Sequence, residues 1–114
     1  MDSNGKTAIT EMKVQAYVVS SHITTIYYKG YTTPYIHYKV GNGSWTQAPG
    51  VAMTATTQKT GYTHKITIDL GDADTLTACF NNGSGSWDSK SGSNYTFNSG
   101  TYTYSNGNNI LINN

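Results

Sequence analysis

The segment GYTHKITIDL, residues 61–70, most constrains what this chain can fold into, because its side chains alternate in character. One side of the segment carries Tyr62, His64, Ile66, Ile68 and Leu70. Polar residues occupy positions 63, 65, 67 and 69 between them. Successive side chains of a strand point to opposite faces, so the pattern predicts a strand with one buried and one solvated face.

Other short runs rich in β-branched and aromatic residues are separated by turns of Gly, Asn, Ser and Pro. They span residues 12–19, 23–29, 34–40, 50–56, 74–81, 94–97, 100–105 and 110–112, and no segment has a helical period. Short strands with frequent turns predict an all-β fold, an antiparallel β-sandwich of immunoglobulin-like architecture. Residues 1–11 are expected to form a linker or disordered lead-in, residues 12–114 the sandwich, and residues 12–19 an edge strand.

Composition excludes several classes of protein. The chain has seven lysines, no arginine and a formal charge of +1, so it lacks the basic stripe of a nucleic-acid-binding protein. No apolar run is long enough to span a membrane, and the start MDSNGK has no signal-peptide pattern. The single cysteine, Cys79, lies in a predicted strand and is expected to be a buried small hydrophobe rather than a nucleophile.

The ionisable residues do not form a recognisable catalytic or metal site. Asp72 and Asp74 flank one alanine in a predicted turn, and Asp88 stands alone beside Trp87, so no carboxylate pair suited to glycoside hydrolysis is evident. The three histidines have no metal-ligand spacing. We therefore predict that the protein is not an enzyme and holds no cofactor or metal. A calcium ion at the turn aspartates stays open as an alternative.

Both tryptophans follow a glycine-serine turn: Trp45 ends GNGSW, and Trp87 ends NNGSGSW. In one interpretation each ring folds back and plugs an end of the sandwich. In the other, the rings stay exposed as a binding surface, because a flat indole matches the apolar C–H face of a sugar ring. Two tryptophans in the same context favour the second interpretation.

Neutral polar residues near the tryptophans are suited to hydrogen bonding with sugar hydroxyls. Strand alternation places His37 on the same face as Tyr35 and Lys39, away from the core. Three asparagines flank the second loop, and an aspartate follows the second tryptophan. The predicted ligand-binding residues are His37, Trp45, Trp87, Tyr35, Lys39, Asn81, Asn82, Asp88 and Asn94.

These segments resemble family 25 of the carbohydrate-binding modules, a starch-binding group carried by bacterial amylases. The resemblance rests on IYYKGYTTPYIHYKVGNGSWTQAPGVAM, GYTHKITIDL and FNNGSGSWDSKSGSNYTFNSGTYTY, and covers about residues 23–105. It implies a noncatalytic β-sandwich that binds starch, amylose and maltooligosaccharides on a platform of His37, Trp45 and Trp87. The chain departs from the family at Ser89 and Lys90, where asparagines are frequent, and at Tyr31, where tryptophan is common.

The resemblance also implies a setting. Such a module is expected to be a monomer, covalently linked to other domains of a secreted bacterial protein, and located outside the cell or on its surface. Two alternatives remain. One is a starch-binding module of the family 26 type, in which the platform relies on tyrosines. The other is a cell-surface structural or adhesin β-sandwich with no glycan site.

Overall fold

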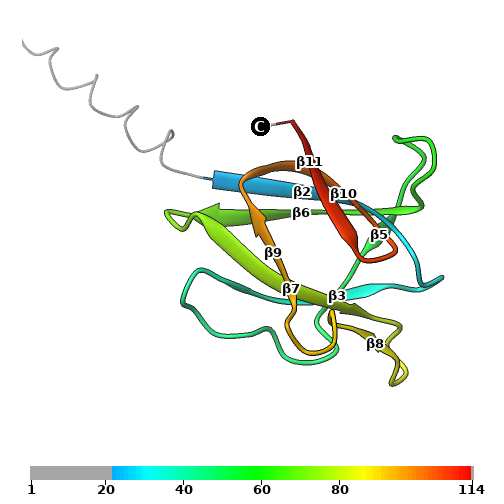
Figure 1. Cartoon of the computed structure of the whole chain (residues 1–114), viewed down its shortest axis with the longest axis horizontal. Helices are drawn as coiled ribbons and strands as arrows, with labels where there is room; N and C mark the ends of the chain where they lie inside the picture. The colour runs from blue at the N-terminus through cyan, green and yellow to red at the C-terminus, as the bar shows by residue number, and fades with distance from the viewer. Residues whose placement is uncertain (1–21, 114) are drawn as a thin grey trace, which may run out of the picture.

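The computed structural model describes residues 22–113, in which every regular element is a β-strand (Figure 1). The predicted all-β fold is confirmed. Within this part of the chain, no helix is long and apolar enough to cross a membrane. The strand predicted at 12–19 and the lead-in at 1–11 lie outside the described residues.

The strands form two sheets that face each other. The first sheet has the order β11 (Asn108–Asn113), β10 (Gly100–Ser105), β2 (His22–Lys29), β6 (His64–Gly71) and β5 (Thr54–Ala55). The second has the order β4 (Val51–Ala52), β3 (Tyr35–Val40), β7 (Thr75–Asn81) and β8 (Trp87–Asp88), and β9 (Tyr95–Asn98) also pairs with β7. β3 pairs with one edge of β7 along its length. On the other edge, β9 pairs with the first half of β7 and β8 with its end.

Three details differ from the sequence expectations. β10 pairs in parallel with β2, whereas the other strand pairs among residues 22–113 are antiparallel. The single strand predicted at 50–56 is divided between the sheets, because the chain crosses at the buried Met53, whose N–H donates to Pro34 O at 3.0 Å. β8 was not predicted, since it lies within a run of glycine and polar residues.

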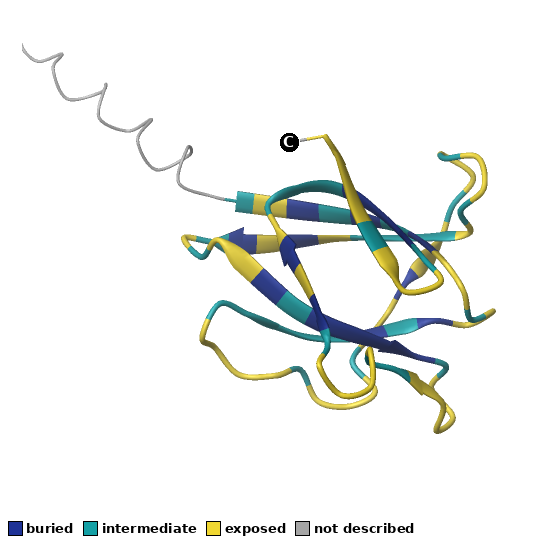
Figure 2. Cartoon of the chain, in the orientation of Figure 1, coloured by how far each residue is buried: buried dark blue, intermediate teal, exposed yellow. Residues whose placement is uncertain are grey.

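The alternation predicted for residues 61–70 is confirmed in β6. Ile68 and Leu70 are buried, whereas Thr67 and Asp69 are exposed (Figure 2). At one end of the core, aromatic rings pack around Phe80, which is fully buried. Its ring centroid lies 4.9 Å from that of Tyr28, 6.0 Å from Tyr95 and 4.5 Å from Tyr104. These rings join the second sheet to β2 and β10 of the first.

The hydroxyls of the core tyrosines have polar partners despite their burial. Tyr95 donates to Asp88 Oδ1 at 2.6 Å, and Tyr104 donates to the other oxygen of the same carboxylate. The Tyr28 hydroxyl accepts a hydrogen bond from the N–H of Tyr31 at 2.9 Å. Burial raises the pKa of Tyr28 to about 12, and burial followed by the bond to Asp88 raises the pKa of Tyr104 far above its usual range.

These raised pKa values predict a loss of stability in alkali. A tyrosine with a folded-state pKa above its unfolded value of about 10 stabilises the fold fully below that pH. That contribution is lost as the pH rises through the folded-state pKa, about 12 for Tyr28. Urea unfolding across this range is expected to show a falling free energy of unfolding. The fall will be shallower in Tyr28→Phe, and parallel curves for the two proteins would contradict this assignment.

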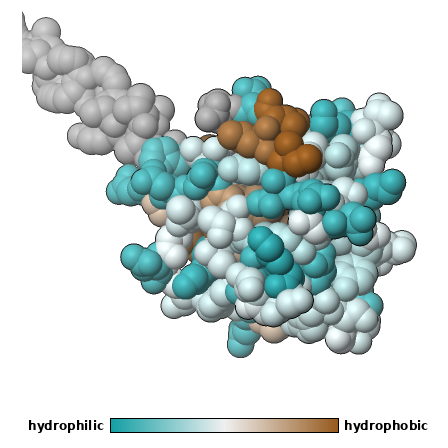
Figure 3. Space-filling model, viewed as in Figure 1, coloured by the Kyte–Doolittle hydropathy of each residue, from teal (hydrophilic) through white to brown (hydrophobic). Residues whose placement is uncertain are grey.

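The outer edge of the first sheet is unusually apolar. β11 exposes Ile110, Leu111 and Ile112, and Figure 3 shows a hydrophobic patch at this edge. In register, Thr25 of β2 lies beside Thr101 of β10, which lies beside Asn113 of β11. The beginning of β2 and the end of β11 are therefore at the same end of the first sheet (Figure 1).

Candidate functional site

The outer face of the second sheet carries the residues singled out in the sequence. Along β3, Ile36 is fully buried in the core, and Tyr38 and Val40 pack against it. Their neighbours Tyr35, His37 and Lys39 lie on the opposite face, since side chains alternate along a strand. The predicted Tyr-His-Lys row is therefore present, with His37 at its centre.

The loop after β3 folds back and places Trp45 beside His37. Gly41 begins this turn at a φ of 53°, a conformation that favours glycine. The N–H of Thr46 then donates to Tyr38 O at 2.8 Å, and the N–H of Tyr38 donates to Thr46 Oγ1 at 3.1 Å. The same Oγ1 lies 2.8 Å from His37 Nδ1. Thr46 thus fixes both the loop and the imidazole ring.

The resulting contact between the first two rings is a stack. The centroids of His37 and Trp45 are 4.9 Å apart, and their planes differ by 23°. Lys39 Nζ lies 5.8 Å from the Trp45 ring centroid, within the range of a cation–π contact. The indole is therefore held by its neighbours before any ligand arrives.

Trp87 reaches the same histidine from the other side. In β8 it pairs with Asn81 of β7, at the end of a tight hairpin. Asn82 braces the hairpin, because its Oδ1 accepts from the N–H of Ser84 at 2.8 Å and of Ser86 at 3.1 Å. The Trp87 and His37 centroids are 5.6 Å apart, with the planes inclined at 75°.

Three rings therefore form one continuous surface, which we call the aromatic platform: Trp45, His37 and Trp87. Trp45 is 38% exposed and Trp87 is 45% exposed, so neither plugs the sandwich. The angle between the ring planes is 23° for His37 and Trp45, and 75° for His37 and Trp87. The difference, 52°, is the smallest tilt possible between the two indole planes. The platform is a bent surface rather than a flat one.

Asn81 was predicted to contact a ligand, and the structure places it elsewhere. It is only 1% exposed, and both ends of its amide are used. Nδ2 donates to Pro49 O at 2.9 Å, while Oδ1 accepts from the N–H of Gly83 at 2.8 Å. Asn81 therefore ties the loop that follows Trp45 to the hairpin that precedes Trp87, and its burial keeps the amide out of reach of a ligand.

The prediction for Asp88 also needs correction. Asp88 follows Trp87 in β8, so its side chain points to the opposite face, toward the core. Both carboxylate oxygens accept hydrogen bonds from the hydroxyls of Tyr95 and Tyr104. Asp88 thus anchors the strand that carries Trp87 and does not reach the platform.

The remaining predicted residues lie around the platform. Tyr35 is half-buried beneath the hairpin: a Cβ added at Gly83 would meet its ring at 2.5 Å, so this close approach requires glycine. Asn94 has a φ of 64°, and its N–H donates to Ser89 O at 2.7 Å. Asn94 and Asn82 therefore shape the loops on either side of β8.

Nothing in the sequence predicted that Thr46 would position the platform. Its contact with His37 joins residues nine positions apart across a turn, and a threonine after a tryptophan has no signature of its own.

The described part of the chain, residues 22–113, contains no group of three or more potential metal ligands. Near the turn considered for calcium, His22 Nδ1 lies 2.8 Å from Ala73 O and 3.2 Å from Asp74 Oδ1. Cys79 is buried opposite His37 in the strand register, and its thiol donates to His37 O at 3.8 Å. Burial raises the pKa of this thiol, which disfavours the reactive thiolate.

Comparison with known proteins identifies the relatives of this chain. Residues 7–113 match the model of the carbohydrate binding domain of family 25. The chain is 58% identical over 84 residues to an alpha-amylase of Niallia circulans, covering 74% of this chain and 6% of that protein. It is 53% identical over 85 residues to a beta/alpha-amylase of Paenibacillus polymyxa, covering 74% and 7%. The chain thus spans only a small part of these amylases.

Solved structures agree with the sequence matches. The CBM25-1 domain of the Paenibacillus polymyxa beta/alpha-amylase superposes with a TM-score of 0.68 at 50% identity, covering 78% of this chain and 85% of that one. The CBM25 of a Bacillus halodurans amylase, in complex with maltotetraose, has a TM-score of 0.71 at 43% identity, covering 81% and 98%. These matches confirm the β-sandwich fold and the resemblance noted in the sequence. This chain belongs to family 25 of the carbohydrate-binding domains.

Proposed function

We propose that this domain binds starch and α-1,4-linked maltooligosaccharides on the aromatic platform and performs no chemistry on them. The observation that carries the proposal is the pair of exposed indoles held against His37 with their planes at least 52° apart. Family membership supports a carbohydrate ligand, and a relative at 43% identity was solved with maltotetraose.

The bent platform suits an α-glucan. Each indole presents a flat apolar face on which a sugar ring can stack through its C–H groups. In an α-1,4-linked chain, successive glucose rings are turned relative to one another, so neighbouring units meet differently oriented planes. A β-1,4-linked chain is a flat ribbon and requires aromatic rings that are nearly coplanar.

Polar groups beside the rings supply partners for the sugar hydroxyls. Thr46 occupies His37 Nδ1, which leaves Nε2 for a ligand. The ammonium group of Lys39 lies 5.8 Å from the Trp45 ring centroid, and Asn94 lies in the loop after β8. We retain these residues with Tyr35 and Asn82 as the polar surroundings of the platform, and we leave out Asn81 and Asp88.

The physical role of such a domain is to raise the local concentration of what it is attached to. We infer that it belongs to a larger bacterial protein, an amylase or a cell-surface complex, that acts outside the cell on starch. The relatives support this setting, because each is an amylase many times longer than the matched segment. The domain is expected to act as a monomer.

Parallel titrations with maltose, maltohexaose, cellohexaose and granular starch test the proposal. A shallow site buries little area, so dissociation constants of roughly 10⁻³–10⁻⁵ M are expected for maltohexaose. Tryptophan fluorescence will shift on binding, because ligand covers the exposed rings. Cellohexaose will bind far more weakly, and soluble starch will yield no new reducing ends. Absence of any response to maltohexaose or starch would favour a structural or adhesin domain instead.

A further inference from the structure

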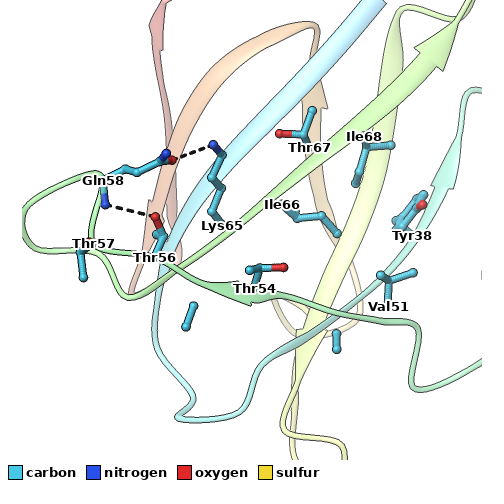
Figure 4. A pocket seen from close by; sticks show the side chains of 12 residues that line it. Tyr38, Val51, Thr54, Thr56, Thr57, Gln58, Lys65, Ile66, Thr67 and Ile68 are labelled. Atoms are coloured by element: carbon cyan, nitrogen blue, oxygen red, sulfur yellow. Dashed lines mark hydrogen bonds between the residues drawn. The ribbon is translucent and has the colours of Figure 1, made fainter.

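A second concave surface lies around the edge of the sandwich from the platform. It is a groove of about 680 Å³ between the two sheets, where both end in two-residue strands, β4 and β5 (Figure 4). β5 pairs with β6 only at Lys65 and His64, so from Ile66 to Ile68 that edge of β6 has no strand partner among residues 22–113. The size falls within the range of small-molecule sites in proteins.

The chemistry of the groove favours an uncharged ligand rich in hydroxyls. Its lining includes the threonines Thr54 and Thr57, the amide of Gln58, and the apolar side chains of Ile66, Ile68 and Val51 (Figure 4). Neutral hydrogen-bonding groups over an apolar surface match the two kinds of surface that a sugar ring presents.

Lys65 is the one charged side chain that the described residues contribute to the lining, and it already has partners. Lys65 Nζ donates to Gln58 Oε1 at 2.7 Å and lies 5.6 Å from the ring centroid of Tyr27. Among residues 22–113, no acidic residue lines the groove. A ligand there would meet neither a free cation nor a carboxylate, which argues against phosphate, nucleic acid and charged peptides.

The groove and the platform lie on either side of one short segment of the chain. Across the second sheet, Trp87 lies over β8 at one side, and the Trp45 loop closes the free edge of β3 at the other. His37 and Tyr38 are consecutive in β3: the first belongs to the platform, and the second lines the groove from the opposite face. Only the segment from Thr46, bonded to Tyr38, to Val51, paired with Ile36, separates the two surfaces.

We infer that the groove is an extension subsite for the glucan chain that the platform binds. A long α-glucan that leaves the platform past Trp45 passes over the β4 edge and enters the groove, where Thr54, Thr57 and Gln58 bond its hydroxyls. Short oligosaccharides fill the platform alone. This role rests on the proposed function, and it assigns the groove a preference for chain length.

The test compares maltotetraose with a long soluble maltodextrin by calorimetric titration. Thr54→Trp fills the groove with a residue that suits an exposed strand position. We expect maltotetraose affinity to stay within about twofold of the native value, and maltodextrin affinity to fall about tenfold as several hydrogen bonds are lost. Ile112→Trp, which adds the same side chain on β11, the opposite edge strand of the same sheet, is expected to change neither.

A second variant keeps the test decisive if Thr54→Trp does not fold. Thr54→Val with Thr57→Val removes two hydroxyls without changing side-chain shape, and it should also weaken only maltodextrin binding. Unchanged maltodextrin affinity in folded Thr54→Trp, or in the double valine variant if Thr54→Trp disturbs the fold, overturns the extension subsite. So does a change in oligomeric state without a change in maltodextrin affinity, which would mark a protein interface. Failure of the native domain to bind either glucan refutes the proposed function itself.

Discussion

Trp45→Ala and Trp87→Ala are each expected to weaken α-glucan binding by about 1–3 kcal/mol, by analogy with other aromatic stacking platforms. The loss arises because alanine offers no flat apolar face to a sugar ring. It corresponds to a change in dissociation constant of roughly 5- to 150-fold. The midpoint of thermal unfolding should barely move, since both rings are largely outside the core. Calorimetric titration with maltohexaose and a thermal melt measure the two effects.

Matched controls separate stacking from general disturbance of the surface. Trp87→Phe keeps a smaller aromatic face and should retain part of the affinity. Ile110→Ala removes an exposed apolar side chain from the other sheet and should change nothing. A variant in which either tryptophan is lost, yet glucan binding persists and the melting temperature drops, would show that the ring supports the fold.

Asp88→Ala is expected to destabilise the fold by about 2–4 kcal/mol and to weaken glucan binding without any contact to the ligand. The substitution removes the acceptor of two tyrosine hydroxyls, and hydrogen bonds to a charged group are among the stronger ones in proteins. β8 contains only Trp87 and Asp88, so loss of the anchor also frees the indole. The expected stability loss is measured by urea unfolding, and the change in the indole by its fluorescence before ligand is added.

Other variants test whether Asp88 acts on stability and glucan binding through its hydrogen bonds to the tyrosines. In Asp88→Asn the side chain keeps its shape and one oxygen acceptor, so both losses should be smaller. Combining Asp88→Ala with Tyr104→Phe should cost less than the sum of the single changes, since the two groups share one bond. Asp72→Ala, in an exposed turn, serves as the neutral control. If Asp88→Ala left stability and glucan affinity at native values, Asp88 would not be an anchor.

Strong periodic patterns made most of the fold predictable. The alternation of residues 61–70 placed β6 correctly, and the apolar run at 74–81 placed β7. The elements that were missed or merged are two residues long: β4, β5 and β8. A strand of two residues has no period to detect, and its existence depends on partners distant in sequence. The parallel pairing of β10 with β2 likewise depends on where the chain changes sheets after β9.

The arrangement of the three rings could be predicted from the sequence, and the positions of the neighbouring polar side chains less well. Two tryptophans after flexible turns and a histidine on an alternating strand have local signatures, and the structure brings all three together. Asn81 and Asp88 were chosen because they are near Trp87 in sequence. Nearness along a strand places consecutive side chains on opposite faces, so Asp88 reaches the tyrosines of the core instead. The amide of Asn81 is hydrogen-bonded to the backbone of Pro49 and Gly83, and no local sequence pattern reveals these partners.

Thr25, near the start of β2, and Asn113, at the end of β11, are two strand spacings apart, about 10 Å. The first residues of β2 and the last residues of β11 therefore lie at one corner of the first sheet. Other segments of a longer chain attached at this corner would not be separated by the full width of the sandwich. Several copies could therefore follow one another along a chain, each attached at its own corner.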